Sequence, residues 1–390
     1  MELILSRDPL LKILNRIQSV VEKRNTMPIL AYALMVADGD TLTLSATDTE
    51  LSVRAVCDAQ VEEEGILSVP ARKLYDVVRE LPDLPVRMKS ETGDRMLVTC
   101  GRARFTLLCL PGEEFPKIPQ PDEGPHIPVS SQLVARLMDK VHFAMSTDET
   151  RFTLNGAYLR VEPFEDRHVL RMVATDTHRL SVAQYEIMSE SPYLDQPRDV
   201  IIPRKAVGEI HKVLKEEDDQ VELILGENFI QIIKPRFTMI SKLVAGRYPN
   251  YKRAIPEGNN HLLTIQKAGF LSLLRRMVVI SSEKSHSIQF QVMQDSIQVN
   301  SNNPEQEAGE EELEVVYSGP PVTIGFSARY LLEILGAVEG DAVRFSLGGA
   351  GGSCPGHRSR QRKLHVRADA HAIIHVLSGN HPTARFSQYC

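Results

Sequence analysis

The stretch Ala174-Thr175-Asp176-Thr177-His178-Arg179-Leu180-Ser181-Val182 has a shorter copy upstream, and this repetition predicts how the whole chain is organised. The copy is Ala46-Thr47-Asp48-Thr49-Glu50-Leu51-Ser52-Val53, so two identical Ala-Thr-Asp-Thr tetrapeptides start at positions 174 and 46, 128 positions apart. In both copies Leu-Ser-Val follows within two residues, which chance would rarely produce twice. The chain therefore contains a long-period repeat, and such a repeat decides the fold class before any local pattern does.

The bulk composition is that of a globular protein with two to four domains: 390 residues, 42% hydrophobic and 25% charged. No apolar run approaches the ~20 residues of a membrane helix, and the N-terminus lacks the basic start and apolar core of a secretory signal. Cysteines stand singly at positions 57, 100, 109, 354 and 390, which favours reduced thiols over a disulfide framework. These features predict a cytoplasmic protein without membrane association.

Each repeat combines two amphipathic helices with about eight strands. In residues 1–125 the first helix places Leu10, Leu14, Ile17 and Val21 on one face. The second helix opens at Pro70, where the missing N–H would lack a partner anyway. Residues 126–257 replay this order, and residues 258–347 begin it a third time. We therefore predict an α+β fold of three repeated domains, with antiparallel sheets that are covered on one face.

Basic residues gather on the predicted helices, whereas the acidic runs at 62–64, 216–219 and 310–312 lie elsewhere. The helices carry Lys12, Arg16, Lys23, Arg24, Arg72, Lys73, Arg79, Arg136, Lys140, Arg204, Lys205, Lys212, Lys215, Lys267, Arg275, Arg276 and Arg329. Their spacing predicts faces opposite the apolar stripes. A protein of net charge −6 could thus hold a polyanion on its helical surface alone. For any single helix, a solvated face remains the plain alternative.

Seven motifs in order make the chain resemble the bacterial sliding clamps, the beta subunits of the replicative DNA polymerase III. They are Asn25-Thr26-Met27-Pro28-Ile29-Leu30, Val69-Pro70-Ala71-Arg72-Lys73, Asn155-Gly156, Ala174-Thr175-Asp176-Thr177-His178-Arg179-Leu180, Ile202-Pro203-Arg204-Lys205, Ser241-Lys242-Leu243-Val244 and Asn302-Asn303-Pro304-Glu305-Gln306-Glu307, and Tyr317-Ser318-Gly319 adds an eighth. The resemblance covers residues 1 to about 347. It implies a head-to-tail homodimeric ring of six domains, with helices lining a central hole and sheets outside.

The resemblance also implies a function in DNA replication. Such a ring encircles duplex DNA independently of base sequence, slides on it and tethers the polymerase, which raises processivity without catalysis. Positions matching DNA contacts of the family are Arg24 and Arg72, with Arg204, Lys205 and Phe152 as further candidates. The implied partners are double-stranded DNA, the polymerase catalytic subunit, the clamp loader and other proteins with a clamp-binding motif.

Two protein-binding surfaces follow from the same resemblance. Partner proteins of the family insert a peptide with a Gln and two apolar anchors between the second and third domains; matching positions are Leu154, Thr175, His178, Arg179, Leu180, Pro249, Arg253 and Tyr330. Ordinary core packing is the alternative for Leu154, Leu180 and Pro249. Ring closure would bring Phe105 and Leu107 of one chain to Val279 and Ile280 of the other, with Lys73 and Arg102 facing Glu305 and Glu307.

The last forty residues depart from the family. Residues 354–390 hold six Lys or Arg against one Asp, together with five of the twelve His, and the domain pattern stops after Leu347. This abrupt change predicts an incomplete third domain at 258–347 and an aberrant, out-of-frame end at 348–390, which would leave two sheet edges exposed. A basic DNA-binding tail and a metal site at Cys354, His357, His371 and His375 are the alternatives.

No catalytic motif stands out in residues 1–347: there is no Gly-rich phosphate loop, nucleophile elbow or His-x-x-x-His site. Asp48 and Asp176 occupy equivalent positions beside turns, where a carboxylate typically accepts hydrogen bonds from the turn backbone. The rival hypothesis is a β-rich hydrolase that uses Asp176 and His178 with a bound metal. We predict a non-catalytic protein that needs neither cofactor nor metal.

Overall fold

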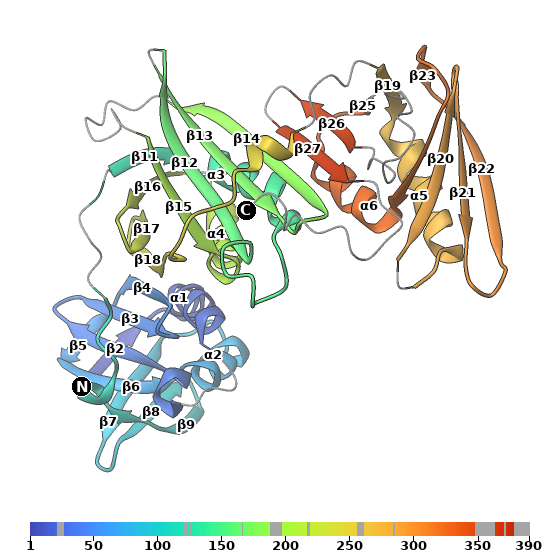
Figure 1. The fold of residues 1–390 in the computed structure, drawn as a ribbon. Helices are drawn as coiled ribbons and strands as arrows, with labels where there is room; N and C mark the ends of the chain where they lie inside the picture. The colour runs from blue at the N-terminus through green and yellow to red at the C-terminus, as the bar shows by residue number, and fades with distance from the viewer. Residues whose placement is uncertain are drawn as a thin grey trace. The chain divides into compact units, whose positions relative to one another are not determined.

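A computed structural model describes residues 1–21, 27–119, 124, 126–165, 167–187, 197–216, 219–255, 261–283 and 285–347, and the backbone of 363–369 and 372–377 (Figure 1). The described residues form two compact units. The first draws on residues 1–134 and 205–243, the second on 135–188, 195–204 and 244 onward. The units therefore do not coincide with the sequence repeats, because the second repeat contributes to both.

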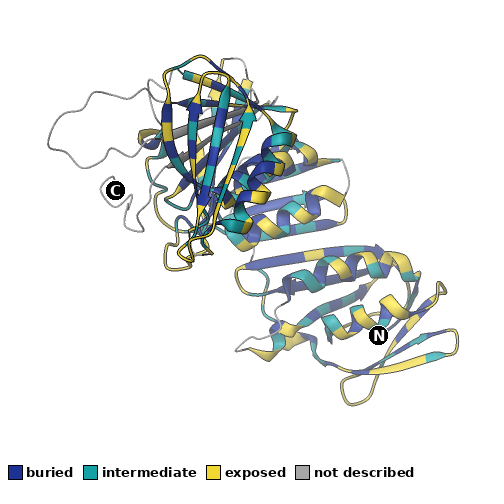
Figure 2. Ribbon diagram, turned by 90° about the vertical axis from the view of Figure 1, so that its right-hand side faces the viewer, coloured by how far each residue is buried: buried dark blue, intermediate teal, exposed yellow. Residues whose placement is uncertain are grey.

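Six α-helices are described, two for each repeat, as the sequence predicts. Their bounds are α1 Arg7–Val20, α2 Ala71–Glu80, α3 Ser131–Val141, α4 Arg204–Glu216, α5 Lys267–Ile280 and α6 Ala328–Ala337. Helix α1 buries Leu10, Leu14 and Ile17, which confirms the predicted apolar face. Figure 2 shows exposed residues along one side of the helices and buried ones in the strands beneath.

The first unit contains two antiparallel sheets. The five-stranded sheet has the order β5 (Gln60–Glu63), β1 (Glu2–Leu5), β7 (Val86–Glu91), β8 (Arg95–Cys100), β9 (Ala103–Leu108). The nine-stranded sheet has the order β10 (Leu110–Pro111), β6 (Gly65–Pro70), β2 (Tyr32–Asp38), β3 (Thr41–Thr47), β4 (Leu51–Asp58), β18 (Phe237–Lys242), β17 (Phe229–Lys234), β16 (Gln220–Leu225), β11 (His126–Ser130). Strand β4 of the first repeat thus pairs with β18 of the second.

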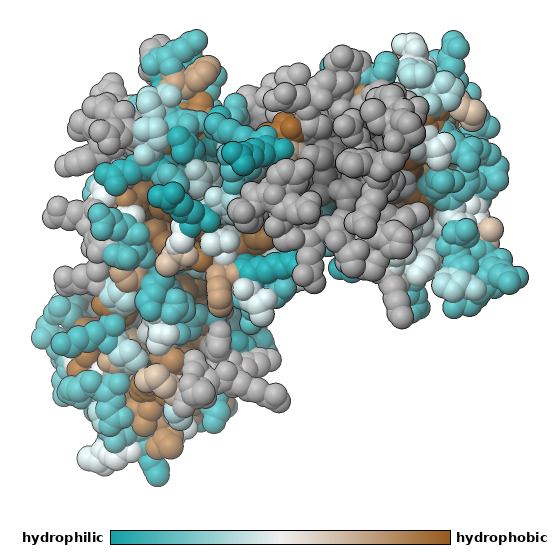
Figure 3. Space-filling view, in the orientation of Figure 1, coloured by the Kyte–Doolittle hydropathy of each residue, from teal (hydrophilic) through white to brown (hydrophobic). Residues whose placement is uncertain are grey.

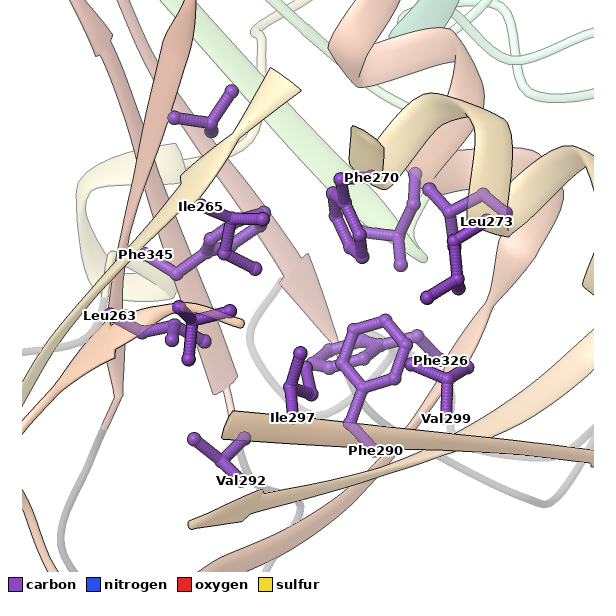
Figure 4. Packing of buried hydrophobic residues seen from close by; sticks show 14 of the residues in the cluster. Leu263, Ile265, Phe270, Leu273, Phe290, Val292, Ile297, Val299, Phe326 and Phe345 are labelled. Carbon is purple, nitrogen blue, oxygen red and sulfur yellow. The ribbon is translucent and has the colours of Figure 1, made fainter. Parts of the chain in front are cut away.

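The second unit repeats this arrangement. Its nine-stranded sheet has the order β15 (Arg198–Pro203), β12 (Gly156–Phe164), β13 (Arg167–Thr175), β14 (Arg179–Ile187), β27 (Ala372–Leu377), β26 (Lys363–Asp369), β25 (Ala342–Leu347), β19 (His261–Gln266), β23 (Val316–Tyr317). Its four-stranded sheet has the order β22 (Ala308–Glu314), β21 (Ser296–Asn302), β20 (Ser287–Met293), β24 (Val322–Ser327). Between them lies an aromatic core, in which the Phe270 ring is 5.7 Å from Phe290 and 5.8 Å from Phe345 (Figure 4).

Strands β26 and β27 correct one expectation about the end of the chain. We expected the domain pattern to stop after Leu347 and to leave sheet edges exposed. Instead, the backbone of β26 pairs with β25, and the backbone of β27 pairs with β14. Alternating backbone N–H and C=O groups can pair in a ladder whatever the side chains, so an altered composition does not by itself prevent strand addition. The candidate metal ligands Cys354, His357 and His371 lie outside the described residues, and nothing is described of the side chain of His375.

Candidate functional site: the repeated turn and its neighbours

The Ala-Thr-Asp-Thr repeat forms the same tight turn twice. In the first turn Asp48 Oδ1 accepts the backbone N–H groups of Glu50 and Leu51 at 2.9 and 2.6 Å. In the second, Asp176 Oδ1 accepts those of His178 and Arg179, both at 2.9 Å. The prediction that both carboxylates serve the turn backbone is confirmed. Thr49 and Thr177 adopt φ values of 81° and 78°, which the paired side-chain hydrogen bonds hold in place.

A third turn of the same design follows β21. Asn303 Oδ1 accepts the N–H of Glu307 at 2.9 Å, and Gln306 adopts a φ of 67°. This turn is one residue longer, because Asn303 N–H bonds Glu307 O whereas Asp48 N–H bonds Leu51 O. Three strand-connecting turns, one in each repeat, therefore share an Asp or Asn side chain that accepts a backbone N–H of the turn, and a non-glycine residue with positive φ.

The second carboxylate oxygen of each Asp reaches a cation. Lys205 Nζ bonds Asp48 Oδ2, and Arg179 Nε donates to Asp176 Oδ2 at 3.0 Å. Neither carboxylate is therefore available as a general base, and no cluster of metal-ligating side chains occurs within the described residues. This geometry argues against the hydrolase alternative, because Asp176, one of its two proposed groups, is occupied by structural contacts.

Arg179 is the centre of the surroundings of the second turn. Its side chain is 7% exposed and also contacts Glu333 of α6 and donates to Phe143 O at 2.6 Å. Its guanidinium stacks over the rings of Tyr330, at 4.4 Å, and Phe143, at 5.1 Å. Charge-assisted and cation–π contacts of this kind orient planar side chains on both sides of the guanidinium. We name Thr175, His178, Arg179, Leu180 and Tyr330 the turn cluster.

The structure brings most of the predicted peptide-binding residues into or beside the turn cluster. The His178 ring lies 6.2 Å from that of Tyr330, and burial raises the pKa of the Tyr330 hydroxyl. Leu180 shares a small core with Ala254, which lies one residue beyond Arg253. Leu154 is 9% exposed and sits on the loop whose Arg151 donates to Thr177 Oγ1 at 3.1 Å.

Two of the predicted positions are peripheral to this cluster. Pro249 is half-buried beside Tyr248, whose ring stacks on that of Tyr158 at 5.1 Å. Arg253 is exposed. Sequence reasoning missed Phe143 and Glu333, although the spacing of Glu333 from Tyr330 on one helix face was a usable signal.

The predicted DNA-binding residues differ in exposure and in the hydrogen-bond partners of their charged groups. Arg24 lies outside the described residues. The guanidinium groups of Arg72 and Arg204 are half-buried and donate to the carbonyls of Val21 and Met145, both at 2.8 Å. Lys205 is exposed but bonded to Asp48.

Phe152 is 72% exposed.

Two helical cations are not on solvent-facing surfaces, which corrects the prediction of uniformly basic outer faces. Lys140 is 1% exposed and pairs with Glu339 at 3.7 Å. Arg16 has a 9% exposed side chain, pairs with Glu216 at 2.5 Å and stacks over Phe237 at 5.0 Å. The helical spacing predicts an outer face for both cations. Spacing shows which residues share a face, but it does not show whether another element covers that face.

The predicted ring-closing residues lie on an edge strand, on two helices and in turns: Phe105 and Leu107 on β9, Val279 and Ile280 on α5, Lys73 on α2, and Arg102, Glu305 and Glu307 just before β9 and β22. Strands β9 and β22 each pair on one side only within the described part of the chain. Phe105 of β9 is 40% exposed and Val279 is 79% exposed, whereas Leu107 is buried and Ile280 half-buried. Lys73, Arg102, Glu305 and Glu307 are exposed.

Three family models cover most of the chain. They are the N-terminal, central and C-terminal domains of the DNA polymerase III beta subunit, and they match residues 1–119, 128–250 and 252–355.

The chain belongs to the beta sliding clamp family.

Relatives agree over nearly the full length. The beta sliding clamp of Pseudomonas aeruginosa is 36% identical over 366 residues, covering 92% of this chain and 96% of the relative. That of Caulobacter vibrioides is 38% identical, with coverages of 88% and 92%. The crystal structure of the clamp from Bartonella birtlesii bound to griselimycin has a TM-score of 0.90 at 33% identity, covering 98% of this chain and all of that one.

Family membership fixes the function at a coarse level. The chain is a DNA sliding clamp: it encircles duplex DNA and tethers the replicative polymerase, which makes DNA synthesis processive. It is a processivity subunit and not an enzyme. The three-domain clamp fold predicted from the repeat is thereby confirmed. No helix among the described residues is long and apolar enough to cross a membrane.

Proposed function

We propose that the turn cluster is the site at which the clamp holds its partner proteins. The observation that carries this proposal is the arrangement around Arg179, which fixes Tyr330 and the second turn side by side. Buried Leu180 and half-buried Tyr330 offer apolar contact, while exposed His178 offers hydrogen bonds. A peptide with one Gln and two apolar anchors suits such a surface. The occupants would be the polymerase catalytic subunit, the clamp loader and other proteins with a clamp-binding motif, in the cytoplasm.

A fluorescent peptide with a Gln and two apolar residues tests this site. We expect Tyr330→Ala to weaken binding at least about tenfold, because an aromatic anchor surface is lost. Phe164→Ala is the matched control: that ring is 51% exposed at the end of β12, away from the turn cluster. Equal binding by wild type and Tyr330→Ala, with unchanged circular dichroism, would place the site elsewhere.

We further propose that two chains close a head-to-tail ring by pairing β9 of one with β22 of the other. Both are edge strands in the described part of the chain, and an unpaired edge is a template for strand addition. Arg102 precedes β9 and Arg104 lies on it, whereas β22 carries Glu310, Glu312 and Glu314, so the charges are complementary. Hydrophilic residues cover the β20–β22 region in Figure 3. Phe105, Leu107, Val279 and Ile280 would supply the apolar contacts, with Lys73 and Arg102 near Glu305 and Glu307.

We also propose that Arg24, Arg72, Arg204, Lys205 and Phe152 lie on the DNA-facing side. Sliding needs weak, exchangeable phosphate contacts without base readout.

The domains would span 1–125, 126–257 and 258–347, and the out-of-frame origin of residues 348–390 stays a hypothesis. Light scattering of the intact chain tests the ring: twice 43.7 kDa is expected, and a monomer would contradict it.

A further inference from the structure

The two joints between successive repeats both contain a cation–carboxylate pair. Each joint sets the first helix of one repeat against the end of the second helix of the next repeat, or against the residues just after it. In the first joint, Arg16 of α1 pairs with Glu216, the last residue of α4, at 2.5 Å. In the second, Lys140 of α3 pairs with Glu339, two residues beyond α6, at 3.7 Å. Each joint lies within one unit of the structure.

The helical positions of the two cations are identical. Arg16 is the tenth residue of α1 and Lys140 is the tenth residue of α3. Strand pairing marks the same joints, since β4 pairs with β18 in the first and β14 with β27 in the second. Both cations are enclosed: their side chains are 9% and 2% exposed. A cation so enclosed needs a carboxylate partner, because burial without one is costly.

The third repeat carries a cation at the same helical position, but this cation is not enclosed in a joint within its own chain. The tenth residue of α5 is Arg276, and its side chain is 57% exposed. It pairs with Glu311 of β22 in its own chain, which is the edge strand corresponding to β4 and β14. An exposed ion pair of this kind contributes little to the free energy of folding, so Arg276 can readily exchange its partner. Arg276 therefore occupies the cation position of a joint, but no second repeat of the same chain encloses it.

The first repeat has the acid without the joint. Its second helix ends at Glu80, and Asp83 follows three residues later, before β7 begins. This region corresponds to the end of α4 at Glu216 and to the residues after α6 that include Glu339. Asp83 is exposed and, among the described residues, no hydrogen bond or ion pair engages its carboxylate.

We propose that Arg276 pairs with Asp83 of a second copy of this chain, so that the joint between chains repeats the two joints within it. This inference rests on the head-to-tail ring proposed above and adds a specific contact to it. On closure Arg276 would exchange its exposed partner Glu311 for Asp83, as the incoming α2 loop encloses the guanidinium. The partner is identified by three cations at the tenth position of the first helix and three acids at the end of the second helix or within three residues after it.

Mixing two single variants gives the sharpest test. Homodimers of Arg276→Glu carry like charges at both seams, and so do homodimers of Asp83→Arg, so each variant alone should dissociate at least about tenfold more readily. A mixed ring of the two variants has one seam with the pair reversed and one seam with the original pair. Native mass spectrometry of an equal mixture should therefore show heterodimers well above the twofold excess over each homodimer that random pairing gives.

A matched control separates this contact from general charge effects. Arg275→Glu makes the same change one residue earlier on α5, at an exposed position, and should leave dimerisation within about threefold of wild type. Circular dichroism and thermal melting would verify that every variant folds. A monomeric wild type would overturn the ring itself. A dimeric wild type in which the mixture forms only statistical heterodimers would overturn the Arg276–Asp83 pairing and leave the ring intact.

Discussion

Asp176 shows how one side chain serves both a turn and its surroundings. Its Oδ1 holds the backbone of the turn, and its Oδ2 binds the Arg179 side chain, which in turn contacts Glu333 and stacks on Tyr330. The hydrogen bonds of the turn can be predicted from the sequence. The contact between this turn and helix α6, which is distant in the chain, cannot. The cation that links them has its charge balanced by two carboxylates, as a buried guanidinium requires.

Replacing Arg179 by alanine should destabilise the chain by about 3–5 kcal/mol, because Asp176 and Glu333 lose their shared partner in a largely buried place. Urea unfolding of the intact chain, followed by circular dichroism, measures this change. Arg253→Ala is the control, since that residue is exposed on the nearby linker. Equal unfolding midpoints for the two variants would contradict the central role of Arg179.

At the scale of elements, register decides which residues of the repeats correspond. The matching Leu-Ser-Val segments are one residue out of step, because Thr47 pairs with Ser52 whereas Thr175 pairs with Leu180. Hairpin register likewise makes Ala103 the counterpart of Phe237, although the shared tripeptide Arg-Phe-Thr at 104–106 and 236–238 would align Phe237 with Phe105. Backbone hydrogen bonds fix these equivalences, and side-chain identity can drift around them.

The edge strand β9 gives the second prediction. Phe105→Asp should convert the dimer to monomer, since a carboxylate would face the acidic strand β22 in place of an apolar contact. Light scattering across a concentration series measures the change. Phe152→Asp is a suitable control, because Phe152 is more exposed and belongs to neither edge strand. A Phe105→Asp chain that stays dimeric would rule out the β9 seam.

At the scale of the whole molecule, the charge distribution determines which cations of the clamp can contact DNA phosphates. An overall charge of −6 disfavours binding everywhere except where cations are concentrated. The structure removes Arg16 and Lys140 from that set by enclosing them in joints, and it occupies Lys205 with Asp48. The remaining contacts to phosphate are therefore fewer than the helical composition suggests, as suits a protein that must slide.

Charge reversal at Arg24 and Arg72 should shorten retention on circular DNA, and the salt dependence of retention should fall by about one unit of slope for each lost phosphate contact. Retention is measured by gel filtration of loaded, nicked circular DNA at several salt concentrations. Arg167→Glu, on the β12–β13 hairpin, is the control. Unchanged retention of the double variant would remove these two residues from the DNA-facing side.

The sequence by itself determined the repeat, the six helices, the capping role of Asp48 and Asp176, and membership in the clamp family, because these depend on local spacing and on ordered motifs. Only the tertiary structure decided which strands cross the repeat boundaries, which helical cations are enclosed, and that β26 and β27 continue the sheet. Local periodicity shows which residues share a face. What covers that face depends on contacts between segments far apart in the chain, and these arise only when the repeats pack.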